Sequence, residues 1–152
     1  MSDKHTLIIG GTRGIGRALV RMFSEHGLLV SVIGRRPASD TDRQIPRARY
    51  WAVDLADELK FLHVLEEIIS KDGKLTHLIF FQRFRGNGDP WVGEMQTSLT
   101  ATKTAINRLA DEFDGKAENS IAIVCSVASH FVADEQPVSY HVAKAGLVQM
   151  AR

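Results

Sequence analysis

The chain has 152 residues, a length that suits one domain. Hydrophobic residues make up 44% and charged residues 24%, which excludes a collagen, a disordered tail and a coiled coil. Nineteen Lys and Arg against 18 Asp and Glu leave a net charge of +1, so there is no basic excess for a nucleic acid or a membrane surface. We therefore expect neither as a partner.

The cysteine content and the N-terminus bear on the cellular compartment. Cys125 is the single cysteine, which excludes an internal disulfide and suits a reducing environment. The first residues lack a signal-peptide pattern, and no apolar run approaches the length of a membrane span. These features predict a cytoplasmic protein.

Short apolar runs alternate along the chain with longer stretches of helical period. Strands are predicted at residues 6–9, 28–33, 50–53, 78–81 and 121–125. Helices are predicted from residue 15 to a cap at Gly27, after a cap at Asp54 or Asp57, over 95–113, and from Ser139 onward, still running at Arg152. Loops are predicted at 35–47, 85–90 and 126–138. The alternation predicts an α/β fold, a doubly wound, Rossmann-like parallel sheet of five strands with right-handed crossovers.

A glycine cluster, Gly10-x-x-x-Gly14-x-Gly16, follows the first predicted strand. Its spacing differs from G-x-G-x-x-G, but the physical reasons for glycine are shared. Gly10 permits a sharp turn, Gly14 lets the backbone approach a pyrophosphate, and Gly16 allows close contact between helix and strand. The following helix N-terminus favours phosphate. An ordinary tight turn is the alternative, but the position of the glycine cluster after the first strand favours phosphate binding.

The end of the second predicted strand bears on the choice between the two nicotinamide cofactors. An NAD site would have Asp or Glu there, whereas this chain has Gly34-Arg35-Arg36. Arg35 and Arg13 can bracket a 2′-phosphate, which favours NADP(H) over NAD(H). Two solvated loop arginines are the alternative. Asp54 can accept a hydrogen bond from adenine or serve as a helix cap.

Tyr140 and Lys144 lie at i and i+4, on one face of a predicted helix. A nearby ammonium stabilises a phenolate, so Tyr140 could exchange protons near neutral pH. Ser126 ends the fifth predicted strand, at the edge where open α/β sheets bind ligands, and could hydrogen-bond a substrate oxygen.

These motifs, with Asp54, match in order and approximate spacing those of the short-chain dehydrogenases/reductases, and the whole chain resembles the first part of that fold. The resemblance implies Tyr140 as general acid/base, Lys144 as the residue that holds the nicotinamide ribose, and Ser126 as the group that orients the substrate. It also implies a hydride transfer with NADP(H). The expected cofactor-binding residues are Gly10, Thr12, Arg13, Gly14, Ile15, Gly16, Arg35, Arg36, Asp54, Leu55, Tyr140 and Lys144.

Three positions depart from the family pattern. Ile9 stands where the family has Thr, and Phe80-Phe81-Gln82-Arg83 replaces the usual Asn-Asn-Ala-Gly. Ser98 lies where the family commonly has the Asn of a proton relay, and a serine there could still bind water. The family also continues through two further strands. We therefore expect residues 1–152 to form one dinucleotide-binding domain, C-terminally incomplete relative to the family, with an exposed apolar sheet edge.

The resulting hypothesis is an NADP(H)-dependent oxidoreductase that interconverts a carbonyl and a hydroxyl of a small molecule. A catalytically impaired or non-catalytic dinucleotide-binding relative is the first alternative, and a flavodoxin-like binding domain is the second. The six histidines lack metal-ligand spacing, so no metal site is expected. In the family the helices matching 95–113 and 139–152 pack between subunits, which implies a possible homo-oligomer.

Overall fold

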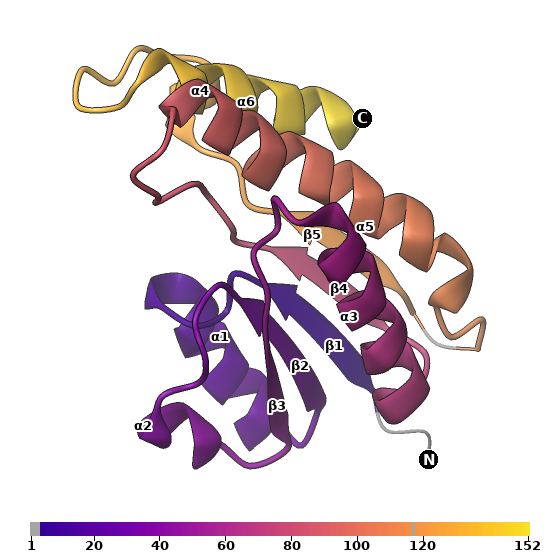
Figure 1. Cartoon of the computed structure of the whole chain (residues 1–152). Coiled ribbons are helices and arrows are strands. Elements are labelled where there is room, and N and C mark those ends of the chain that lie inside the picture. Colours follow the sequence, from indigo (N-terminus) through magenta and orange to yellow (C-terminus); the bar gives the residue numbers. More distant parts are fainter. Residues whose placement is uncertain (1–3, 117) are drawn as a thin grey trace.

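The protein is described by a computed structural model that covers residues 4–116 and 118–152. Within these residues one parallel sheet has the strand order β3-β2-β1-β4-β5 (Figure 1). The strands are β1 (His5–Ile9), β2 (Leu29–Gly34), β3 (Ala48–Ala52), β4 (His77–Phe80) and β5 (Ser120–Ile123). This order confirms the predicted doubly wound sheet. It also excludes the flavodoxin-like alternative, whose strand order is 2-1-3-4-5.

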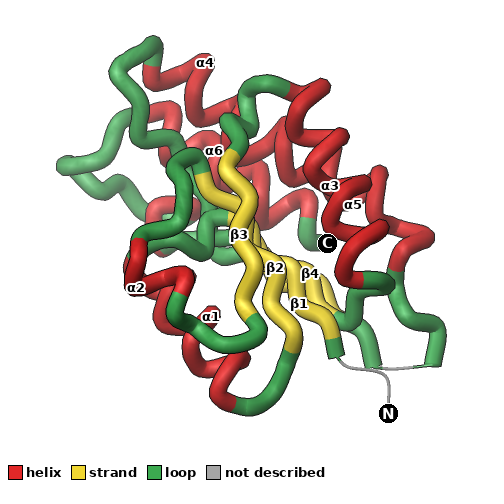
Figure 2. The backbone as a smooth tube through the Cα atoms, turned by 60° about the horizontal axis from the view of Figure 1, so that its bottom comes forward, coloured by secondary structure: helices red, strands yellow, loops and turns green. Residues whose placement is uncertain are grey.

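Helices cover both faces of the sheet (Figure 2). One face carries α1 (Gly14–Glu25), and the other carries α3 (Glu58–Asp72) and α5 (Ala101–Leu109). The chain enters α5 through α4 (Pro90–Glu94) and the π-helical turn η1 (Met95–Thr100), and leaves it through the 3-10 turn η2 (Ala110–Glu112). The remaining helices are α2 (Asp40–Arg43), the 3-10 turn η3 (Val127–Ser129) and α6 (Val138–Met150), which packs against α4, η1 and η3.

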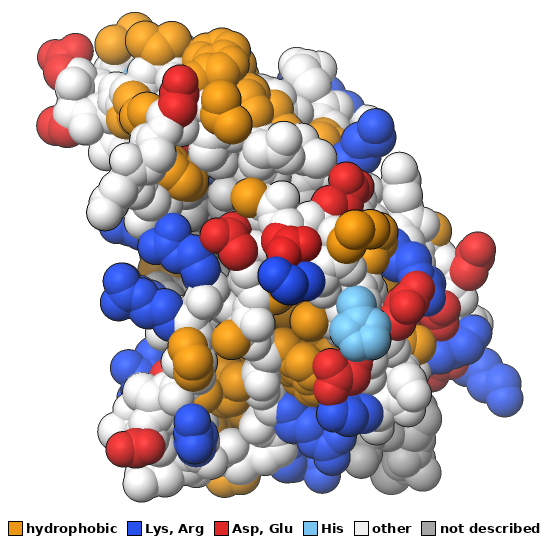
Figure 3. Space-filling model, viewed as in Figure 1, with side chains coloured by type: hydrophobic (Ala, Val, Ile, Leu, Met, Phe, Trp, Pro, Cys, Tyr) orange, Lys and Arg blue, Asp and Glu red, His pale blue; other side chains and the backbone are white. Residues whose placement is uncertain are grey.

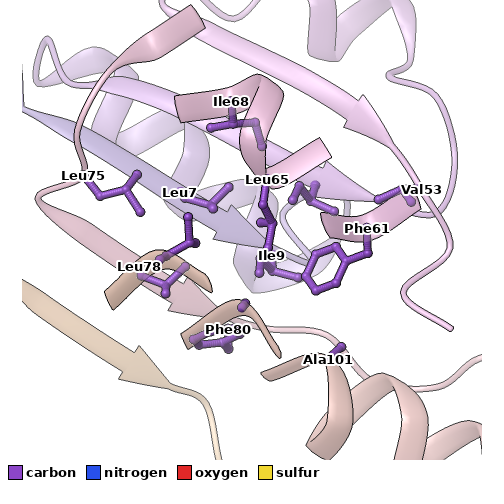
Figure 4. Close-up of a cluster of buried hydrophobic side chains, with 13 residues drawn as sticks. Leu7, Ile9, Val53, Phe61, Leu65, Ile68, Leu75, Leu78, Phe80 and Ala101 are labelled. Atoms are coloured by element: carbon purple, nitrogen blue, oxygen red, sulfur yellow. The ribbon is translucent and has the colours of Figure 1, made fainter. Parts of the chain in front are cut away.

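Strand β1 is buried on both faces and separates two apolar cores. Leu7 and Ile9 point to the side of α3 and α5, where they meet Phe61 and Leu65 (Figure 4). Ile8 points the other way, into the smaller core that Val20 of α1 completes. Alternate residues of a strand face opposite sides, so an unbroken apolar run is what a doubly covered strand requires.

The prediction of a loop at 35–47 was wrong in part, because this segment contains the short helix α2. Ser39 and Asp42 form a capping box there: the Ser39 side chain accepts the Asp42 N–H at 3.2 Å, and the Asp42 carboxylate accepts the Ser39 N–H at 3.2 Å. The Ser-x-x-Asp spacing is a signal for this helix start.

Two helix ends also differ from the prediction. The helical segment expected over 95–113 begins five residues earlier, at Pro90, because the Asp89 side chain accepts the N–H groups of Trp91 and Val92 at 2.7 and 3.3 Å. Aspartate followed by proline is a common helix start. The last helix ends at Met150 instead of running through Arg152. No helix of the described residues is long and apolar enough to span a membrane.

The exposed apolar edge expected at the fifth strand is present. Among the described strands β5 pairs with β4 alone, and Ile121 and Val124 are 46% and 36% exposed. Apolar side chains also gather over α4 and α6 at the upper end of the molecule (Figure 3).

The turn between β1 and α1 brings the chain into close contact with the segment after β4. Gly10 has a φ of +89°, and a Cβ built on it would lie 2.6 Å from the backbone nitrogen of Gln82. A Cβ on Gly16 would lie 2.6 Å from the Gly10 carbonyl oxygen. Both positions therefore require glycine, the first for conformation and space and the second for space.

We expect Gly10→Ala to lower the free energy of unfolding by about 1–2 kcal/mol or more, because it combines a left-handed conformation with a backbone overlap. Gly115→Ala is the control: its Cβ would meet nothing within 4 Å. Urea unfolding of both variants tests this. Equal stabilities of the two variants would contradict it.

At the amino-terminal end of the central strand β1, His5 belongs to a buried polar chain. Its Nδ1–H donates to the Gly73 carbonyl oxygen at 3.0 Å, and its Nε2 lies 2.8 Å from the Ser31 hydroxyl, which can donate to that nitrogen or to Asp72 at 2.7 Å. Burial lowers the pKa of His5 below its ordinary 6.5, against the opposing effects of the Gly73 carbonyl and the Asp72 charge.

The unfolded chain therefore takes up a proton that the folded chain resists, so stability is full above pH 6.5 and falls as the pH drops below it. We expect the unfolding free energy to decrease between pH 7.5 and 5.5, and His5→Gln to reduce that slope. Burial lowers the pKa of His77 as well, so part of the slope remains. His63→Gln, the same substitution at an exposed position, is the matched control. A slope of opposite sign would show that folding favours the protonated His5.

Candidate functional site

The glycine turn leaves the N-terminus of α1 open. Helix α1 begins at Gly14, its N-cap is Arg13, and no side chain caps it. Gly14 has a φ of +53°, and a Cβ on it would meet nothing within 4 Å. The first backbone N–H groups of a helix have no partner inside the helix, so this end can receive an anion. Thr12 is half-buried beside the turn, and Ile15 is exposed on α1.

The end of β2 lies against this turn. A Cβ on Gly34 would come within 2.4 Å of the Thr12 side chain, so Thr12 rests on the residue that precedes Arg35. Arg35 is exposed and donates to the Arg85 carbonyl oxygen at 2.8 Å. Arg13 and Arg36 are exposed too. Lys and Arg side chains gather on this edge of the molecule, between the loop before α4 and α1 (Figure 3).

Asp54 follows β3 at the same edge of the sheet. Its carboxylate accepts the Ala56 N–H at 3.0 Å, whereas Asp57 is the residue that caps α3. Asp54 is exposed, and only one of its carboxylate oxygens is engaged in this turn. Leu55 is half-buried against the larger core. Asp54 is therefore placed to accept a hydrogen bond from a ligand without giving up a helix cap.

Tyr140 and Lys144 lie one turn apart on α6. The Lys144 ammonium is 5.7 Å from the Tyr140 ring centroid and donates to the Val124 carbonyl oxygen at 2.8 Å. Lys144 is only 4% exposed. Burial lowers the pKa of Lys144, while the nearby Cys125 and Glu94 act against that shift. The bond to Val124 joins α6 to the segment just after β5.

Ser126 follows β5 and begins η3. Its hydroxyl accepts the Ala128 N–H at 3.2 Å, and its carbonyl oxygen accepts the Ser129 hydroxyl at 2.6 Å. Turn η3 packs against α6, which brings Ser126 to the helix that carries Tyr140. No hydrogen bond joins the Ser126 and Tyr140 hydroxyls in the described part of the chain, so each O–H group can donate to a substrate oxygen.

Two charged residues at this site were not assigned a role from the sequence. The Arg83 guanidinium lies over the Tyr140 ring, 4.3 Å from its centroid, and donates to the Gln136 side chain at 3.0 Å. The Glu94 carboxylate, 2% exposed, is 3.8 Å from Arg83. The signal for Glu94 was its helical spacing from Ser98, since a carboxylate four residues before a buried serine falls on the same face.

Ser98 is fully buried, and its hydroxyl is committed. It donates its proton to Glu94 at 2.7 Å, and the binding of a water by Ser98 stays a prediction. The Ser98 carbonyl oxygen accepts the Thr102 hydroxyl at 2.6 Å, and Thr102 in turn accepts the Gln82 amide at 2.8 Å. The π-helical turn η1 around Ser98 is thus bonded to the segment after β4.

The altered segment after β4 is accommodated in different ways along its length. Phe80 is buried in the larger core, and Phe81 packs against the smaller core on the α1 side. The backbone of Gln82 lies against Gly10, and the Arg83 guanidinium lies over the Tyr140 ring. The glycine turn and the open N-terminus of α1 therefore still fit the phosphate-bearing part of a dinucleotide. Arg83 brings an additional cation to the phenol of Tyr140.

Comparisons with known proteins agree with this architecture. A family model described as short chain dehydrogenase matches residues 4–152. A 3-ketodihydrosphingosine reductase from Bacteroides thetaiotaomicron is 30% identical over 79 residues, which are 52% of this chain and 28% of that protein. An NADP-dependent mannitol dehydrogenase from Aureobasidium melanogenum is 23% identical over 170 aligned residues, which cover all of this chain and 64% of that protein.

Solved structures share the fold at low identity. A 3-oxoacyl-[acyl-carrier protein] reductase from Brucella melitensis has a TM-score of 0.83 at 18% identity, over 99% of this chain and 68% of that one. A short-chain dehydrogenase/reductase from Serratia marcescens has a TM-score of 0.81 at 19% identity, over 97% of this chain and 65% of that one.

The chain thus spans about two thirds or less of the two curated relatives and of the Serratia structure. Because the family match extends over nearly all of its residues, on the fold that those structures share, the chain belongs to the short-chain dehydrogenase/reductase family.

Proposed function

We propose that the chain is an NADP(H)-dependent oxidoreductase that interconverts a carbonyl and a hydroxyl. The observation that carries the proposal is the pairing of Tyr140 with the buried Lys144 on α6. This pair is joined to the open end of α1 through two consecutive residues after β4: Gln82 backs onto Gly10, and Arg83 lies on Tyr140. A phosphate-binding turn and a proton donor therefore belong to one continuous site.

In the reducing direction the Tyr140 hydroxyl gives its proton to the carbonyl oxygen, and in the oxidising direction its phenolate takes the proton back. Lys144 stabilises the phenolate electrostatically and is the residue that would hold the nicotinamide ribose. The Ser126 hydroxyl would donate to the substrate oxygen and orient it. NADP(H), when bound, supplies or accepts the hydride that completes the exchange.

The preference for NADP(H) rests on the residues after β2 and in the glycine turn. Arg35 and Arg36 stand where an NAD site carries an acidic residue, and Arg13 precedes α1. Guanidinium groups match the oxygens of a 2′-phosphate. The similarity to an NADP-dependent mannitol dehydrogenase supports the same choice. Asp54 and Leu55 would lie beside the adenine.

A second candidate is a dinucleotide-binding relative with impaired catalysis or none. It is favoured by Arg83, whose guanidinium covers the Tyr140 ring at a position where the family has a small residue. The buried Lys144 beside Tyr140 favours the enzyme. The proposal extends to a cytoplasmic protein with a small carbonyl or alcohol substrate. It also extends to a homo-oligomer formed through the helical segment 95–113 and through α6, on which Val142 and Met150 are exposed.

Calorimetric titration with NADPH and with NADH tests the cofactor. We expect tighter binding of NADPH, and Arg35→Ala should weaken NADPH binding by about tenfold or more while leaving NADH nearly unaffected. Arg43→Ala is the matched control, because Arg43 is an exposed arginine at the end of α2. Equal affinities for the two cofactors, or an equal loss of both in Arg35→Ala, would refute the NADP(H) assignment.

A panel of aldehydes and ketones, with NADPH consumption as the readout, tests the catalytic assignment. Tyr140→Phe should lower the rate by about 10²–10⁴-fold, because the phenylalanine ring cannot donate a proton. Tyr50→Phe should retain activity, since Tyr50 lies on β3 and packs against the smaller core. Undiminished turnover in Tyr140→Phe would exclude Tyr140 as the acid and base.

A further inference from the structure

Two cations from different elements face the aromatic ring of Tyr140. Arg83, just after β4, has its guanidinium 4.3 Å from the ring centroid, and Lys144 of α6 has its ammonium 5.7 Å from it. A cation at this distance from a ring is attracted to it, and it stabilises the ring far more strongly once the hydroxyl has ionised. Arginine remains protonated at any pH at which a phenol titrates, so Arg83 is the permanent cation of the two.

A buried carboxylate accompanies Arg83. Glu94 of α4 is 2% exposed, and one of its oxygens accepts the Ser98 hydroxyl at 2.7 Å and the Phe84 N–H at 3.3 Å. Its other oxygen, Oε1, has Arg83 Nε at 3.8 Å, and within the described residues both of these buried atoms lack a hydrogen bond. A charge buried to this extent requires an opposite charge nearby. Arg83, at 3.8 Å, and Lys144 are the cations near it.

We propose that Arg83 and Glu94 act as a pair that positions Tyr140 and sets how readily its hydroxyl releases a proton. Arg83 is a positioning residue in this account, because it contacts the ring of Tyr140 and not the reacting atoms. The inference rests on the proposed function, since it assigns the pair to the proton donor of that reaction.

Arg83 is in contact with other residues on three sides. Glu94 approaches it from α4, Gln136 accepts its NH2 from the loop before α6, and the Tyr140 ring lies beneath it. Glu94 is itself fixed by Ser98 one turn later. The guanidinium thereby links β4, α4 and α6, and its place over the ring does not depend on one flexible side chain.

The remaining groups near Tyr140 leave the charge balance to these residues. The His141 ring is 6.4 Å from the Tyr140 ring, and its Nε2 accepts the Ala133 N–H at 2.9 Å, which requires a neutral imidazole there. Cys125 acts on Lys144 across the end of β5. Asp134 and Glu135 are exposed and screened by solvent.

Arg83, Lys144 and Glu94 therefore carry a net charge of one positive unit around a neutral phenol. Ionisation of Tyr140 brings the group to neutrality. The two members of the proposed pair then act on the phenolate with opposite sign: the guanidinium favours it, and the carboxylate opposes it.

The two tyrosines of the chain permit a direct test without substrate or cofactor. In a Tyr50→Phe background Tyr140 is the single tyrosine of the chain, so the phenolate absorbance in a spectroscopic pH titration reports it alone. We expect Arg83→Met to raise the midpoint of that titration by about one pH unit or more, and Glu94→Gln to lower it. Arg83→Lys should raise the midpoint less than Arg83→Met does, because lysine restores the positive charge without the planar group.

The same variants made with Tyr50 in place supply a control for folding, because burial raises the pKa of Tyr50 to about 12. A variant that unfolds brings Tyr50 down to the value of a free phenol, whereas a folded variant keeps its late step. If Arg83→Met does not fold, the direction of the Glu94→Gln shift decides by itself. Shifts of the same sign in the two variants, or midpoints within about 0.3 pH units of the unmodified chain, a shift too small for a charge at this distance, would overturn the proposal.

The same preparations, titrated with NADPH, separate this inference from the proposed function. A chain that binds NADPH but shows no opposed shifts retains the proposed function and loses the role of Arg83 and Glu94. A chain that shows the opposed shifts but binds no nucleotide retains the charge pair and loses the cofactor assignment.

Discussion

The site depends on the close approach of two backbone segments at the carboxyl edge of the sheet. The turn after β1 and the segment after β4 come so near that a side chain on Gly10 would overlap the nitrogen of Gln82 at 2.6 Å. Gln82 is held in turn by its amide bond to Thr102 on α5. Because Arg83 follows directly, the position of this backbone determines where its guanidinium meets Tyr140. The phosphate-binding turn and the phenol are thus set by one contact.

The substitutions that distinguish this chain from the family pattern are physically matched to one another. Gln82 is paired with Thr102, and Arg83 is paired with Glu94. Glu94 is paired with Ser98, at the position where an asparagine is common. Gln82 and Arg83, the new polar residues after β4, each have a polar partner on the helical segment from α4 to α5. The changes therefore act as a set that alters the surroundings of Tyr140 and leaves the fold intact.

Most of the fold followed from local patterns. An unbroken apolar strand, a glycine turn and a helical stripe are properties of neighbouring residues, and the structure has all five predicted strands within two residues of their expected ends. Errors lay where capping chemistry decides a boundary, at Ser39 and at Asp89. The Tyr140 and Lys144 pair could also be predicted, because residues at i and i+4 share a helix face in any tertiary setting.

The sequence by itself determined the α/β alternation, the glycine turn and the helix face that carries Tyr140 and Lys144, because each depends on spacings of a few residues. Tertiary structure alone decided the partners of Arg83. Gln136 lies 53 positions away along the chain, and its meeting with Arg83 follows from the placement of β5 beside β4. The charge balance around the phenol was decided in the same way, since burial and distance between separate elements set it, and neither is a property of local sequence.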